Sequence, residues 1–124
     1  MREVTRAVKA SVCWLDGHHG NDRQQQTMRI LKVTEEAGEV AQAWIGFTGQ
    51  NPRKGVTHTD REVADELADV ALTALVAIES LGFEADEVLR ACAIKVLGRL
   101  GDAGPAEPRQ PGDPAQPVKT VRNI

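Results

Sequence analysis

Apolar residues recur along residues 1–101 with the period of α-helices. Apolar positions recur every three or four residues, and no useful stretch shows the strict alternation of a β-strand. The pattern predicts helices at about 2–15, from Asn21 or Asp22 to about Ile45, from a cap at Thr59 to Gly82, and at about 85–100. We therefore expect an all-α fold, a bundle of four helices.

Glycines and capping residues set the expected helix ends. The first helix is expected to stop at 16–17, and the second is expected to run to about Ile45, where Gly46 and Gly49 break it. Thr59, with Glu62 three residues later, forms a capping box at the start of the third helix. Gly101 follows the fourth helix as a left-handed cap.

Prolines divide the chain into two predicted regions. Residues 1–101 hold one of the six prolines and form the expected helical domain, whereas residues 102–124 hold the other five, three residues apart. This spacing matches the three-residue turn of polyproline II. The region 102–124 is expected to be a flexible end, or an extended arm lying along a neighbouring subunit.

The expected third helix is apolar around most of its circumference. Such a helix must be buried on several sides, and three other short helices do not easily surround it. Pairing of helices from two or more chains would complete the bundle, so we expect a homodimer or homotetramer. A monomeric bundle with this helix at its centre is the alternative.

Composition and charge exclude several classes of protein. The 124 residues suit one domain, and the net charge of −3 argues against a protein that binds polymeric nucleic acid. No stretch reaches the 18 or so apolar residues needed to span a membrane. The charged first residues lack the apolar core of an export signal, so we expect a cytoplasmic protein in which Cys13 and Cys92 are reduced thiols.

Charged residues are concentrated on one arc of about 100° on each of two expected helices. The arcs carry Lys32, Glu35, Glu36 and Glu39 on the second helix, and Glu62, Asp65, Glu66 and Asp69 on the third. They can be two solvated acidic faces. However, the same arcs continue into Met28 and Ala43, and into Thr73 and Val76, which are residues of a protein interior. Carboxylates on an interior face need neutralisation, and a divalent metal ion neutralises several at once.

The candidate ligands also indicate which metal is expected. All of them are carboxylate oxygens, which suit Mg²⁺, with Mn²⁺ as a substitute. None of the three histidines lies three residues after a helical glutamate, as a di-iron bundle requires. Magnesium held by a few carboxylates keeps water ligands and recruits phosphate groups, so the cluster indicates phosphate chemistry.

Two segments resemble those of a known enzyme family. Residues 32–40, Lys-Val-Thr-Glu-Glu-Ala-Gly-Glu-Val, and 65–70, Asp-Glu-Leu-Ala-Asp-Val, resemble the MazG-like all-α nucleotide pyrophosphohydrolases. The family pattern is Glu-x-x-Glu followed, after a loop, by Glu-x-x-Asp. Here the two motifs are separated by 26 residues, and the resemblance covers about 30–100.

The resemblance implies roles for the acidic residues. As in the family, Glu36, Glu39, Glu66 and Asp69 would hold Mg²⁺, and Glu35 would orient or deprotonate the attacking water. The implied activity is a house-cleaning hydrolysis of nucleoside or deoxynucleoside triphosphates to the monophosphate and pyrophosphate.

Four further residues are candidates for contacts with the nucleotide. Lys32 lies one turn before Glu36, where it either meets a phosphate or only pairs with that glutamate. Trp44 is a candidate to stack on the base, or else a core or interface residue. The resemblance adds Lys95 and Arg99 on the fourth helix.

Other functions remain open on the same residues. Ile94 stands where the family carries an asparagine, so a non-catalytic sensor of nucleotide or metal is one alternative. A purely structural dimer with acidic surfaces is another.

Overall fold

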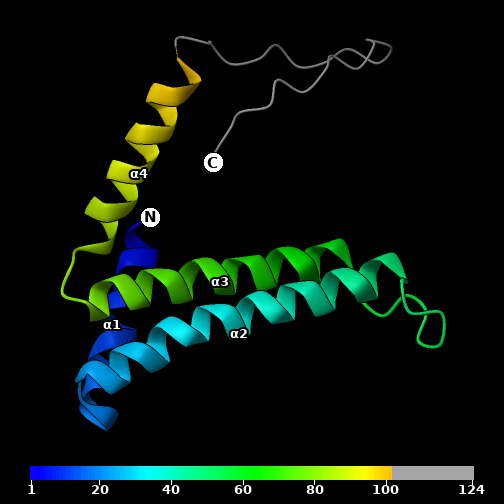
Figure 1. Cartoon of the computed structure of the whole chain (residues 1–124), viewed down its shortest axis with the longest axis horizontal. Coiled ribbons are helices and arrows are strands. Elements are labelled where there is room, and N and C mark those ends of the chain that lie inside the picture. Colours follow the sequence, from blue (N-terminus) through cyan, green and yellow to red (C-terminus); the bar gives the residue numbers. More distant parts are fainter. Residues whose placement is uncertain (102–124) are drawn as a thin grey trace. The chain divides into compact units, whose positions relative to one another are not determined.

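The computed structural model describes residues 1–101, which form four α-helices and no strand (Figure 1). The helices are α1 (Arg2–His19), α2 (Arg23–Thr48), α3 (Asp60–Ser80) and α4 (Ala85–Leu100). The expected all-α fold is confirmed. The proline-rich region 102–124 lies outside the described residues. None of the helices described is both long and apolar enough to cross a membrane.

The expected ends of the first two helices were wrong by about one turn. Helix α1 continues through Gly17 and ends at His19, followed by the C-cap Gly20, whose φ is positive at 73°. Helix α2 continues through Gly46 and ends at Gly49, with φ 65°. A glycine inside a helix costs only about 1 kcal/mol, so tertiary contacts outweigh it, whereas a left-handed residue does terminate the helix.

The expected start of the third helix and end of the fourth were correct. Thr59 Oγ1 accepts a hydrogen bond from the Glu62 N–H at 3.2 Å, and the Thr59 N–H donates to Glu62 Oε2 at 2.6 Å. This is the predicted capping box. Helix α3 ends at Ser80, just before the expected Gly82, and Gly101 follows α4 with φ 65°.

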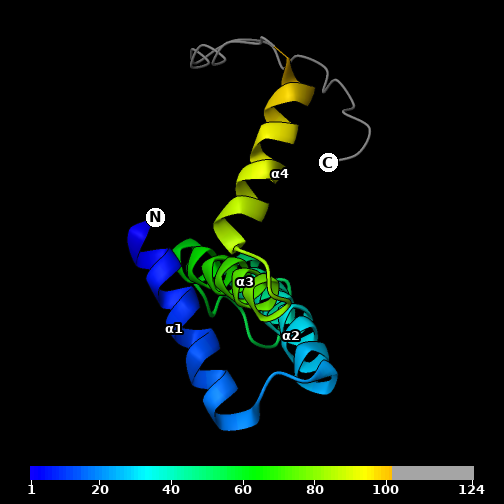
Figure 2. The same ribbon diagram turned by 90° about the vertical axis from the view of Figure 1, so that its left-hand side faces the viewer.

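Met1–Val88 form one compact unit, and Leu89 begins a second. Within the first unit α2 and α3 run antiparallel, side by side, and α1 packs against α3 (Figures 1 and 2). The domain boundary expected after residue 101 stays a prediction.

The core of the first unit is built from small residues. Its buried apolar side chains are Val8, Ala43, Val63, Ala77 and Ala85. Large apolar side chains remain half exposed, among them Leu67 on α3, which is 53% exposed. Within the first unit, therefore, α3 is not buried on all sides.

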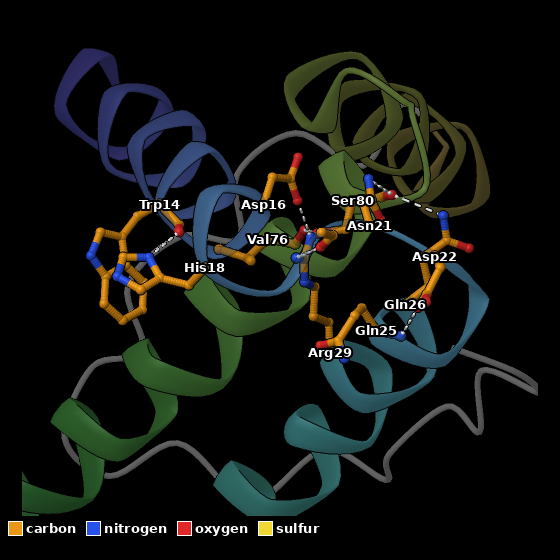
Figure 3. A network of polar contacts seen from close by, with 11 residues as sticks. Trp14, Asp16, His18, Asn21, Asp22, Gln25, Gln26, Arg29, Val76 and Ser80 are labelled. Carbon is orange, nitrogen blue, oxygen red and sulfur yellow. Dashed lines mark hydrogen bonds and ion pairs between the residues drawn. The ribbon is translucent and has the colours of Figure 1, made fainter.

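A buried arginine joins three parts of the first unit (Figure 3). The Nη1 of Arg29 on α2 donates to Asp16 Oδ1 at 2.7 Å and to Ser80 Oγ at 3.0 Å, and its Nη2 donates to the Gly20 carbonyl at 2.8 Å. Ser80 Oγ in turn donates to the Val76 carbonyl. The guanidinium thus links the end of α1, the following loop and the end of α3.

Candidate metal and nucleotide site

Two helices bring three glutamates together where α2 packs against α3. Glu36 and Glu39, one turn apart on α2, and Glu66 on α3 each offer a carboxylate oxygen, and these oxygens lie within 4.8 Å of one another. We call these three residues the acid cluster. Their spacing of three places the α2 pair on one helix face, and the packing of α3 against that face adds the third carboxylate.

Lys32 contacts one member of the acid cluster and one neighbour of it. Its Nζ lies 2.9 Å from Glu36 Oε1 and 3.1 Å from Glu35 Oε2. These hydrogen bonds, the one to Glu36 first, raise the pKa of Lys32, so the ammonium stays protonated at neutral pH. Glu36 is only 12% exposed, whereas Glu35 is 61% exposed and faces water.

The acid cluster carries more negative charge than its lysine neutralises. The negative charge of Glu36, partial burial and the charge of Glu66 together raise the pKa of Glu39. Among residues 1–101, Glu36 and Glu35 each form an ion pair with Lys32, whereas Glu39 and Glu66 have no ion-pair partner. Converging carboxylate oxygens without a counter-charge are a donor set that fits a hard divalent cation.

A groove of about 720 Å³ begins beside the acid cluster. Lys32 and Glu35 form part of its wall, and the rest comes from α1, α2 and α3. The other lining residues are Ser11, Leu15, His19, Gln25, Met28, Arg29, Leu31, Leu72, Thr73 and Val76. A largely apolar surface that also holds polar groups is typical of a small-molecule site.

The family model of the MazG nucleotide pyrophosphohydrolase domain matches residues 24–101. The chain belongs to this family. Comparisons with curated proteins and with solved structures gave no significant match. The match contains the acid cluster and most of α2, while the groove residues of α1 lie before its first residue.

The structure of this MazG domain brings together five of the nine predicted site residues. They are the three members of the acid cluster with Lys32 and Glu35. Asp69 lies one turn after Glu66 on α3, but it is not among the carboxylates that converge in the described structure. Its role as a ligand stays a prediction.

The structure does not test the remaining three predicted residues as substrate contacts. Trp44 is 53% exposed, packs on Phe47 with ring centroids 5.5 Å apart, and is not among the groove residues. Lys95 and Arg99 lie on α4 within the second unit. Their contacts with a nucleotide stay predictions.

Sequence reasoning missed the contribution of α1 to the groove beside the acid cluster. Ser11, Leu15 and His19 line the groove, although no residue of α1 was predicted as a site residue. Met28 and Thr73 did carry a signal, since both lie on the arcs that bear the carboxylates, and both line the groove. The α1 residues carried none, because their approach depends on how α1 packs.

Proposed function

We propose that this MazG-family protein is a Mg²⁺-dependent nucleoside triphosphate pyrophosphohydrolase that releases a nucleoside monophosphate and pyrophosphate. The observation that carries the proposal is the convergence of three carboxylates from the two motif helices, beside a groove large enough for a nucleoside. Membership of a family of nucleotide pyrophosphohydrolase domains supports it.

The residues for holding the metal are the acid cluster, with Asp69 as the expected fourth ligand. When bound, Mg²⁺ neutralises phosphate charge and lowers the pKa of a coordinated water. Mn²⁺ suits the same oxygen ligands.

The remaining roles fall to side chains at the edge of the groove. Glu35 accepts the proton of the water that attacks the α-phosphorus, while the bond from that phosphorus to its bridging oxygen breaks and pyrophosphate leaves. Protonated Lys32 offers positive charge to the phosphates. The apolar groove takes the nucleoside, and Lys95, Arg99 and Trp44 are proposed as further substrate contacts.

The proposal is tested by pyrophosphate release from a panel of standard and modified nucleotides with Mg²⁺. Removing a residue that only orients a metal ligand already lowers metal affinity or activity by about 10–100-fold. We therefore expect Glu36→Gln and Glu66→Gln each to lower release by about 100-fold or more, with helicity unchanged. Asp65→Asn is the matched control, because Asp65 neighbours Glu66 but pairs outward with Arg61 at 2.8 Å.

Two results would contradict catalysis. Full activity in both glutamate variants would remove the acid cluster from the reaction. Tight nucleotide binding by the wild-type chain without any product, across the whole panel, would instead identify a sensor.

A further inference from the structure

We infer that Gly46 is a positioning residue, whose missing side chain lets the end of the α2–α3 loop seat on α2 and so fixes where α3 begins. This inference rests on the proposed function, because its consequence is the placement of Glu66 opposite the two α2 glutamates of the acid cluster.

The contact at Gly46 leaves no space for a side chain. Gly46 is buried, and a Cβ built on it would collide with His58 Nδ1 and Thr57 Oγ1. The Thr57 N–H donates to the Gly46 carbonyl at 2.9 Å. That carbonyl is one of the last four of α2, which have no partner inside the helix, so the loop also satisfies a helix end. We call this contact of Thr57 and His58 with Gly46 the loop seat.

A second close approach lies next to the loop seat. Gly49 ends α2 with a φ of 65°, and a Cβ there would lie 3.1 Å from Val56 Cγ2. Glycine therefore suits both positions where the chain turns back along α2: Gly46 for its close contact, and Gly49 for its positive φ as well as its neighbour. Helix propensity alone would favour alanine at Gly46, so the glycine is explained by the contact rather than by the helix.

The loop seat sets the register between the two motif helices. Thr59, the N-cap of α3, directly follows the seated residues. Glu66 lies seven residues after Thr59, and Gly46 lies seven residues after Glu39. Seven residues of helix are two turns and about 10.5 Å, so antiparallel helices that start from this seat bring the two glutamates to the same level. A shift of the seat would move Glu66 away from Glu39.

The test uses a substitution, its rescue and a matched control in the full chain. Gly46→Ala introduces the collision. Adding Thr57→Ala and His58→Ala removes the side-chain atoms that the new Cβ would meet, so this triple variant restores the loop seat. Gly17→Ala is the control, because Gly17 is also helical but has no atom within 4 Å of an added Cβ.

Two measurements separate the seat from its consequence. Hydrogen exchange of the residue 57 amide reports the bond to the Gly46 carbonyl, and calorimetric titration of the metal-free protein with Mn²⁺ reports the acid cluster. Loss of residues that orient metal ligands weakens metal binding by about 10–100-fold. We expect Gly46→Ala to lose the amide protection and to bind Mn²⁺ about tenfold or more weakly, with the triple variant and Gly17→Ala close to wild type.

Specific outcomes overturn the inference. Protection of the residue 57 amide in Gly46→Ala would show that the loop seat tolerates a side chain. If Gly46→Ala lost protection of the residue 57 amide but kept its Mn²⁺ affinity, the loop seat would not position Glu66. A triple variant that bound Mn²⁺ as weakly as Gly46→Ala would lead to the same conclusion. If the wild-type chain itself bound no Mn²⁺, the metal site of the proposed function would fail, which the exchange data distinguish from failure of the seat.

Discussion

Glu39 has a carboxylate neighbour on its own helix, another on α3, and no ion-pair partner in the described part of the chain. Its raised pKa, caused first by the charge of Glu36, means that the folded chain holds a proton there more tightly than the unfolded chain does. Stability then falls as pH rises through that pKa, because the folded state must lose the extra proton. The ionised side chain therefore opposes folding at neutral pH when no cation is present.

Replacing Glu39 tests this balance of charge. We expect Glu39→Gln to raise the melting temperature of the metal-free protein at pH 7, and the gain over wild type to shrink as pH falls and Glu39 becomes protonated. The increase in melting temperature that Mg²⁺ gives the wild type should be largely lost in the variant.

Calorimetric melting with and without Mg²⁺, between pH 4 and pH 8, provides the measurement (about the range in which a carboxyl group with a raised pKa titrates). Glu87→Gln, in the first turn of α4, is the control for removing an exposed acid. A metal-free Glu39→Gln protein less stable than wild type at neutral pH would show that repulsion in the acid cluster is not significant.

At the scale of the element, the start of α3 depends on its capping box. The Thr59 N–H and hydroxyl both contact the carboxylate of Glu62 and lower its pKa. A depressed pKa means that this contribution is present above the unfolded pKa of Glu62 and is lost as pH falls through its folded pKa. Thr59 and Glu62 thus stabilise the first turn of α3, the helix that bears Glu66.

Removing the cap should weaken α3 by a measurable amount. We expect Thr59→Ala to lower the free energy of unfolding by about 1 kcal/mol, and Thr59→Ser to retain most of it, since serine supplies the same hydroxyl. Urea denaturation at pH 7 checks both variants. Equal stability of Thr59→Ala and wild type would mean that the loop seat alone holds the start of α3.

At the scale of the whole molecule, Arg29 holds α1 and the end of α3 to α2. Its guanidinium is 7% exposed and has three partners from different parts of the first unit (Figure 3). Removing it leaves the partly buried Asp16 carboxylate and the Gly20 carbonyl without their donors. Unsatisfied groups of this kind cost about 1–3 kcal/mol each.

We expect Arg29→Ala to lower the free energy of unfolding by about 2 kcal/mol or more. Arg61→Ala is the comparison, because its pair with Asp65 is exposed, and exposed pairs contribute about 0–1 kcal/mol. Urea denaturation of both variants measures the difference. Similar values for the two would show that Arg29 does not join these elements energetically.

The assembly of chains is the other question at this scale. The half-exposed apolar side chains of α2 and α3, such as Ile30 and Leu67, fit the expected homodimer or homotetramer. Sedimentation at micromolar concentration should give a mass that is two or four times 13.4 kDa. A single 13.4 kDa species would favour the monomeric alternative.

How far the sequence predicted this protein depends on how local each feature is. The capping box at Thr59 and the left-handed glycine at Gly101 lie within a few residues of the ends that they set, and both were predicted correctly. Gly17 and Gly46 were misread as helix ends, because a glycine does not show whether tertiary contacts continue the helix. For Gly46 those contacts are with Thr57 and His58, eleven and twelve residues away.

The sequence by itself determined the four helices and the two arcs of carboxylates, because helical periodicity can be recognised within a few turns of consecutive residues. The pair of Lys32 and Glu36, which are one turn apart, was one of the two alternatives for that lysine, and the structure shows it. Only the tertiary structure decided that Glu66 meets the α2 glutamates, that α1 forms a wall of the groove, and that Gly46 seats the loop. Those contacts join residues far apart in the chain, and their geometry depends on how whole helices pack.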